Sequence, residues 1–84
     1  MEERVVKPFT IWKHFKGTMA FIIAVAEHTE TGEKFVVYRC TGNLGKTNHK
    51  DGVIYARPLE MFLSEVDHEK YPEVTQKYRF EELG

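Results

Sequence analysis

The feature that most constrains the fold is a pair of alternating apolar segments joined by a short polar turn. Residues 20–28 read AFIIAVAEH and residues 33–40 read EKFVVYRC, with a polar turn that contains Gly32 between them. Side chains that alternate with a period of two are typical of β-strands, and glycine accepts the positive φ angle that a tight turn requires. The two segments therefore predict an antiparallel β-hairpin.

The first strand of this hairpin is apolar on both faces. Phe21, Ile23 and Val25 occupy one face, and the other carries Ile22, Ala24 and Ala26. A strand without a polar face is typical of the centre of a sheet that is covered on two sides. We therefore expect residues 20–28 at the centre, with both faces buried.

Four further segments complete the predicted fold. Residues 10–15 (TIWKHF) alternate as well, and residues 53–59 (VIYARPL) form a strand that Pro58 ends or confines to an edge, because proline has no N–H to donate. Residues 59–66 fit one or two helical turns, and YRF at 78–80 supplies a last short strand. Five strands and one helical segment in a short chain predict an all-β small barrel, which closes its own edges.

The chain of 84 residues predicts one domain, residues 9–82, preceded by an N-terminal arm, residues 1–8. Its one cysteine excludes an internal disulfide, and no Cys/His spacing suggests a metal site or a cofactor. The longest apolar run, residues 21–26, is far shorter than the roughly 20 residues that span a membrane. These features predict a soluble cytoplasmic protein without a membrane partner.

Charge is distributed unevenly along the chain. Residues 1–59 hold nine Lys or Arg and six acids, whereas residues 60–84 hold three Lys or Arg and seven acids. A basic body with an acidic tail is compatible with binding a polyanion, although ordinary solubility charge is the preferred explanation. The tail segment 67–78 is polar, is interrupted by Pro72, and is expected to be a loop or extended arm.

The stretch CTGNLGKT, residues 40–47, differs from a phosphate-binding loop by having Cys40 in place of the first glycine. Such a loop needs a helix directly after the Lys-Thr pair, and here NHKDGV follows, which is poor in helix formers. We therefore predict a turn between two strands. Three residues of this loop, Lys46, His49 and Lys50, could still contact a phosphate, and a solvated loop is the alternative.

No group of residues predicts catalysis. Cys40 lies in a strand, where a buried apolar role is usual for cysteine, and the four histidines follow no ligand spacing. Aromatic residues interleaved with basic ones are more informative, because rings on a sheet stack bases or hold extended peptides, and basic groups add phosphate contacts. The candidate ligand-binding residues of the strands are Trp12, His14, Lys16, Tyr38, Tyr55 and Arg57. The competing interpretation places most of these rings in the core.

Several segments together resemble the bacterial domain-of-unknown-function family DUF1653. They are WKHFKG at 12–17, AEHTETGEKFVVY at 26–38, YARPLEMF at 55–62 and YRF at 78–80. The resemblance implies an SH3-like barrel and implies no activity. The sequence departs from the family in a longer, more polar loop at 42–52 and in DHEKYPEVTQ, residues 67–76.

The resulting functional hypothesis is a non-enzymatic recognition domain that binds a peptide or protein, or a nucleic acid. Because SH3-like barrels bind both classes, the fold does not decide between them. The alternative is a small-metabolite or enzyme-associated domain with a pocket around His14, Tyr38 and Arg57. These three residues either share a surface or form a buried network in which Arg57 pairs with an acid and His14 caps a backbone group.

Overall fold

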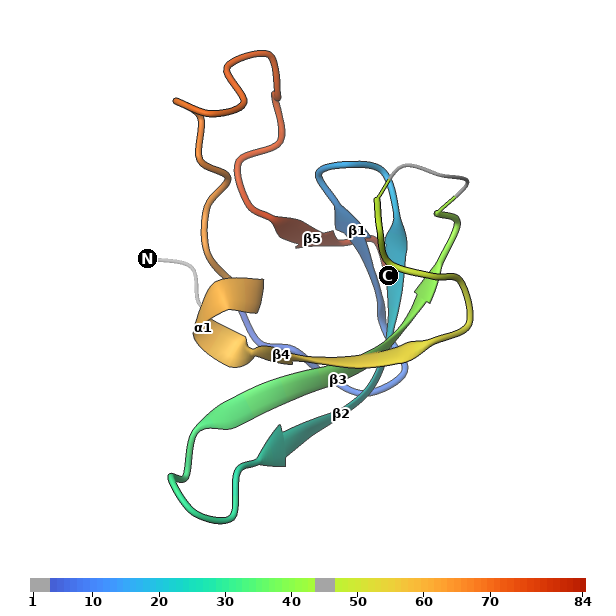
Figure 1. The fold of residues 1–84 in the computed structure, drawn as a ribbon, viewed down its shortest axis with the longest axis vertical. Coiled ribbons are helices and arrows are strands. Elements are labelled where there is room, and N and C mark those ends of the chain that lie inside the picture. The colour runs from blue at the N-terminus through green and yellow to red at the C-terminus, as the bar shows by residue number, and fades with distance from the viewer. Residues whose placement is uncertain (1–3, 44–46) are drawn as a thin grey trace.

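A computed structural model describes residues 4–43 and 47–84 (Figure 1). Within these ranges it contains five strands and one helix: β1 (Ile11–His14), β2 (Met19–Glu27), β3 (Lys34–Thr41), β4 (Ile54–Pro58), α1 (Leu59–Phe62) and β5 (Phe80–Glu82). The strands pair antiparallel in one sheet with the order β4-β3-β2-β1-β5. The predicted all-β class, the strand number and the short helical segment are confirmed, but the last strand covers residues 80–82 instead of 78–80 and the helix ends at Phe62 instead of reaching residue 66.

The predicted hairpin is formed by β2 and β3, which pair from Met19 with Thr41 to Glu27 with Lys34. In its turn, His28 Nδ1 accepts the backbone N–H groups of Glu30 and Thr31 at 3.1 and 3.3 Å. Gly32 follows with a φ of 75°, which explains why a glycine stands there.

The sheet curls over a core but does not close by hydrogen bonds into the predicted barrel, because β4 and β5 remain its two edges. Side chains join these edges instead. The guanidinium of Arg57 on β4 lies 5.1 Å from the ring centroid of Phe80 on β5, and Phe80 stacks on Phe62 of α1 with centroids 4.1 Å apart. Tyr38 and Trp12 complete this aromatic core, at 5.9 and 5.3 Å from Phe62.

The expectation that both faces of β2 are buried is wrong. The strand lies at the centre of the sheet, and Ala20 and Ile22 are buried on its inner face. Phe21 on the outer face is 37% exposed, and a register shift between Ile22 and Ala24 interrupts the regular alternation of faces along the strand. A chain this short supplies too little additional structure to cover a second face.

The residues before β1 and after α1 are attached to the sheet. Val6 is buried in the core, and Arg4 donates from Nη2 to the Phe80 carbonyl oxygen at 3.0 Å. Residues 4–8, expected as an arm, therefore contribute to the packing. The long segment between α1 and β5 is held by a bridge between Glu65 and Tyr78. None of the helices in the described ranges is long and apolar enough to cross a membrane.

Candidate functional site: a cation-lined pocket

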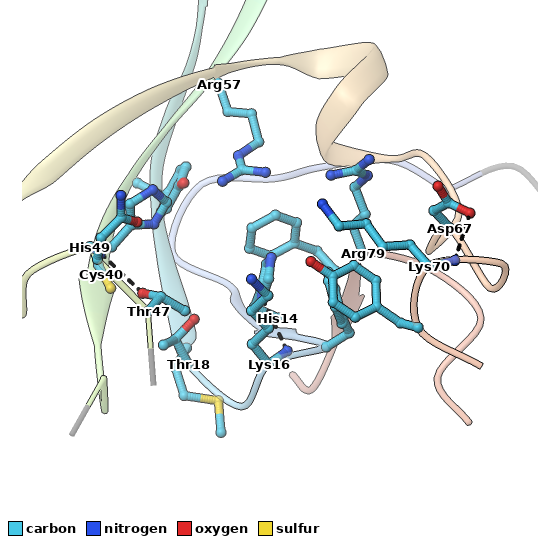
Figure 2. Close-up of a pocket in the computed structure, with 16 residues that line it drawn as sticks. His14, Lys16, Thr18, Cys40, Thr47, His49, Arg57, Asp67, Lys70 and Arg79 are labelled. Carbon is cyan, nitrogen blue, oxygen red and sulfur yellow. Dashed lines mark hydrogen bonds between the residues drawn. The ribbon is translucent and has the colours of Figure 1, made fainter. Parts of the chain in front are cut away.

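A pocket of about 320 Å³ opens between the inner face of the sheet and the segment that precedes β5 (Figure 2). We call it the cationic pocket, and its lining residues are His14, Phe15, Lys16, Thr18, Met19, Tyr38, Cys40, Thr47, Asn48, His49, Arg57, Asp67, Lys70, Tyr71, Arg79 and Phe80. They come from several strands, the loop between β3 and β4, and the segment between α1 and β5. The site is therefore assembled from residues that are distant in sequence.

The pocket holds more positive than negative charge. Its charged lining residues are the cations Lys16, Arg57, Lys70 and Arg79 and the acid Asp67. The Asp67 carboxylate accepts the backbone N–H groups of Glu69 and Lys70 at 3.1 and 3.3 Å, so it caps a turn. The ion pair found in the described ranges joins Lys34 to Glu27, and neither residue lines this pocket. The pocket cations therefore have no carboxylate partner within the described part of a chain whose net charge is −1.

The two guanidinium groups enter the pocket from different elements. Arg57 extends from β4 toward the middle of the pocket, and Arg79 comes from the residues just before β5 (Figure 2). The ring of Phe80 supports the Arg57 charge through its π face. The Arg79 Nε is buried and has no acceptor among residues 4–43 and 47–84. Both side chains thus retain N–H donors that described protein acceptors do not use.

His14 is a neutral hydrogen-bond donor placed among these cations. The residue is 8% exposed, and its Nδ1 accepts the backbone N–H of Lys16 at 3.1 Å, which leaves the ring proton on Nε2. Burial first, and then the positive charges of Arg57 and Lys16, lower the pKa of His14 from 6.5 to about 4. Burial and a positive potential both disfavour the charged imidazolium, so the ring stays neutral.

His49 lines the pocket wall on the side of the loop between β3 and β4. Its ring stacks on Tyr55 with centroids 4.5 Å apart and an interplanar angle of 28°. Burial lowers the pKa of His49, and the charges of Arg57 and Lys16 lower it further. Both pocket histidines are therefore uncharged at neutral pH.

The loop that carries Thr47 and His49 is organised by Asn43. The Asn43 Oδ1 accepts the backbone N–H and the hydroxyl of Thr47 at 2.8 and 3.0 Å, and its Nδ2 donates to the carbonyl oxygens of Thr47 and His49. The predicted turn is confirmed where it is described: Cys40 belongs to β3, and no helix follows Thr47 in residues 47–53. The predicted contact Lys46 lies outside the described residues.

We expect Asn43→Ala to lower the free energy of unfolding by about 1–3 kcal/mol, because it leaves partly buried polar groups of the loop without partners. The ring of His49 should also lose its fixed position on Tyr55. Urea unfolding measures the first effect, and ring-to-ring nuclear Overhauser effects measure the second. Asn48→Ala is the control, because the Asn48 side chain is exposed and has no hydrogen bond within the described ranges. An Asn43→Ala variant with unchanged stability and an ordered His49 ring would contradict this role.

The structure brings several of the sequence-predicted residues together and separates others. Those that line the pocket are His14, Lys16, Tyr38, His49 and Arg57. Trp12 does not line it: the ring is buried in the core, and its indole N–H donates to Thr10 Oγ1 at 3.0 Å. Tyr55 supports His49, and its hydroxyl accepts the backbone N–H of Lys50 at 2.9 Å, but neither Tyr55 nor Lys50 is part of the wall.

Both interpretations of His14, Tyr38 and Arg57 describe part of the structure. His14 accepts a backbone N–H, as the buried-network interpretation requires. Arg57 has no acidic partner in the described ranges, which departs from the buried-network interpretation, and the Tyr38 hydroxyl has no hydrogen-bond partner there. All three residues line one pocket, and His14 and Tyr38 are 8% and 2% exposed.

Sequence reasoning missed the contribution of the C-terminal segment to the pocket. Lys70 and Tyr71 lie in a stretch that reads as a polar loop, and Arg79 and Phe80 stand out in the sequence only as a closing motif. Each of these pairs joins a basic residue to an aromatic one. The strand residues were selected because basic and aromatic residues alternate there. The same combination at Lys70-Tyr71 and Arg79-Phe80 could have identified these positions.

Cys40 lies in the pocket wall as a neutral thiol. It is buried, and burial followed by the charge of Asp51 raises the pKa of its thiol, which opposes a role as nucleophile. In residues 4–43 and 47–84, no three His, Cys, Asp or Glu side chains gather closely enough to hold a metal ion.

Fold and site together define a small all-β domain with a cation-lined pocket. Its sequence belongs to the family DUF1653, described as protein of unknown function, whose family model matches residues 10–82. The family membership inferred from the motifs is thereby confirmed. No curated protein and no solved structure matches the chain.

Proposed function

We propose that this protein is a binding domain whose ligand places an anionic group in the cationic pocket. The observation that carries this proposal is the convergence of four cationic side chains without a carboxylate partner in the described ranges. Like charges that share a site repel one another, and an anion both relieves this repulsion and supplies acceptors for the guanidinium donors.

The size of the pocket favours a small ligand, or a single group of a larger one, over an extended chain. A volume of about 320 Å³ lies at the small end of the range for ligand sites, which is roughly 300–1,000 Å³. A nucleic-acid surface needs rings that are free to stack on bases, and the Trp12 ring is buried in the core. The small-molecule hypothesis is therefore better supported than the peptide and nucleic-acid hypotheses.

His14 provides an internal reporter of binding. Its charged neighbours that lower its pKa are all cations. An anion bound among them offsets their potential, so the pKa of His14 should rise toward 6.5 when the pocket is occupied.

We expect inorganic phosphate to shift the ring signals of His14 saturably in NMR titrations, and Arg57→Ala to weaken this binding about 10–100-fold. The magnitude corresponds to the loss of about 1.5–3 kcal/mol for hydrogen bonds to charged groups. The matched control is Arg39→Ala, which removes the same charge from an exposed residue of β3 that does not line the pocket.

Folding of both variants is checked from their amide spectra before titration. If Arg57→Ala and Arg39→Ala weaken phosphate binding equally, the effect comes from the overall charge of the protein and not from the pocket. The absence of any saturable shift at His14 would overturn the proposed site.

A further inference from the structure

The lining of the cationic pocket separates into two ends of different chemistry (Figure 2). At one end, Arg57, Arg79 and Lys70 approach one another from β4 and from the segment before β5. At the other end lie Thr18, Cys40, Thr47 and His49, with His14 and Lys16 between the two groups. A ligand that fills the pocket therefore contacts both a charged and an uncharged surface.

The uncharged end offers hydrogen bonds and polarizable contacts without net charge. The pKa of Cys40 is raised and that of His49 is lowered, so both groups are neutral. Met19, at the start of β2 beside Thr18, also lines the pocket. A thioether, an imidazole face, hydroxyls and an amide suit a neutral polar molecule better than a second charge.

The charged end suits a dianion better than a monoanion. Two guanidinium groups and one ammonium group converge there, and arginine matches the geometry of phosphate oxygens with paired N–H donors. A phosphate monoester carries about −1.5 to −2 charges at pH 7, whereas a carboxylate carries one. The single acid of the wall, Asp67, is already engaged by backbone N–H groups and does not compete.

Resting on the proposed function, we infer that the ligand is a phosphate monoester of a small, neutral, polar molecule, in the class of a nucleoside or sugar monophosphate. Its phosphate lies between Arg57 and Arg79, and the Nε2–H of His14 donates to the phosphate or to the ester oxygen. Its uncharged body lies against Met19 and His49.

The test uses protein labelled with ¹³C in the methionine methyl groups, in which Met19 reports on the uncharged end. Met61, exposed on α1 and absent from the pocket wall, is the internal control. Acetate, inorganic phosphate, ribose 5-phosphate, AMP and adenosine are titrated at constant ionic strength. The His14 ring and the methyl signals are followed together.

We expect phosphate to shift His14 but not Met19, and acetate to bind about tenfold more weakly than phosphate. At least one of the two monoesters should bind about tenfold more tightly than inorganic phosphate and shift both His14 and Met19. Asn48 supplies the amide of the pocket wall. Asn48→Ala should therefore reduce the tighter binding of the monoester and leave the affinity for inorganic phosphate unchanged.

The outcomes separate this inference from the proposed function. If no anion shifts His14, both fail. If phosphate binds in an Arg57-dependent way, but acetate binds equally well or neither monoester improves on phosphate, the proposed function stands and the ligand class is wrong. If adenosine, which has no phosphate, shifts Met19 and binds as tightly as AMP, the inferred role of the phosphate is wrong.

Discussion

Phe62→Ala should lower the free energy of unfolding by about 3–5 kcal/mol, which is the largest change we expect from a single substitution in the core. Phe62 is fully buried and meets three other aromatic rings, those of Trp12, Tyr38 and Phe80. Its helix spans four residues, which is too short to hold its position without such contacts. A domain of this length has a total stability of about 4–13 kcal/mol, so the loss is a large fraction of the total.

Urea unfolding followed by circular dichroism measures this loss. Met61→Ala is the matched control, because Met61 lies on the same helix and is 46% exposed, and its change should stay within about 0.5 kcal/mol. The loss in free energy of unfolding caused by Phe62→Leu should lie between the losses caused by Phe62→Ala and Met61→Ala. A Phe62→Ala variant as stable as Met61→Ala would contradict the position of Phe62 at the centre of the core.

Local patterns in the sequence were sufficient to predict the elements of this fold. The β2–β3 hairpin follows from alternation and a glycine turn, and the end of β4 follows from Pro58, which lies on an edge strand. The lack of a helix in residues 47–53 follows from the absence of helix formers after Thr47. Each inference depends on neighbours in the chain, so no knowledge of tertiary contacts was needed.

The exposed outer face of β2 and the open edges of the sheet could not be predicted in this way. Alternation shows which residues share a face, but not whether the chain supplies a layer to cover that face. Phe21 is apolar and partly exposed for this reason. Closure of the sheet likewise depends on contacts between distant residues, such as Arg57 with Phe80.

The candidate site was predictable in its strand residues and hidden in its C-terminal ones. His14, Tyr38 and Arg57 stand out because polar groups occur within apolar strands. The polar segment that carries Lys70 gives no such contrast. Its count of acids suggests a negatively charged tail opposing a basic body, yet Lys70 and Arg79 of this tail point into the cationic pocket. Net charge along the sequence does not reveal where individual charges meet in space.

The free energy of unfolding should decrease as the pH falls from 6.5 to about 4, by up to about 1.4 kcal/mol per pH unit from His14 alone. In the folded protein the pKa of His14 is about 4, whereas in the unfolded chain it returns to 6.5. Between these values the unfolded state binds a proton that the folded state excludes, so the stability present above pH 6.5 is lost toward pH 4. The lowered pKa of His49 acts in the same direction.

His14→Asn isolates this contribution from the carboxylates that also titrate near pH 4. The side-chain carbonyl oxygen of the introduced asparagine can accept the Lys16 N–H in place of the His14 Nδ1, but the amide cannot become charged. Urea unfolding across pH 4–7 should therefore give a shallower slope for the variant than for the native protein. Equal slopes, or a His14 ring that titrates near 6.5 in the folded state, would contradict the lowering of the His14 pKa by burial and by the neighbouring cations. Inorganic phosphate should flatten the native profile and leave that of His14→Asn less affected, because burial lowers the pKa of His14 most, and an anion among Arg57, Lys16 and Arg79 offsets the positive charges that lower it further.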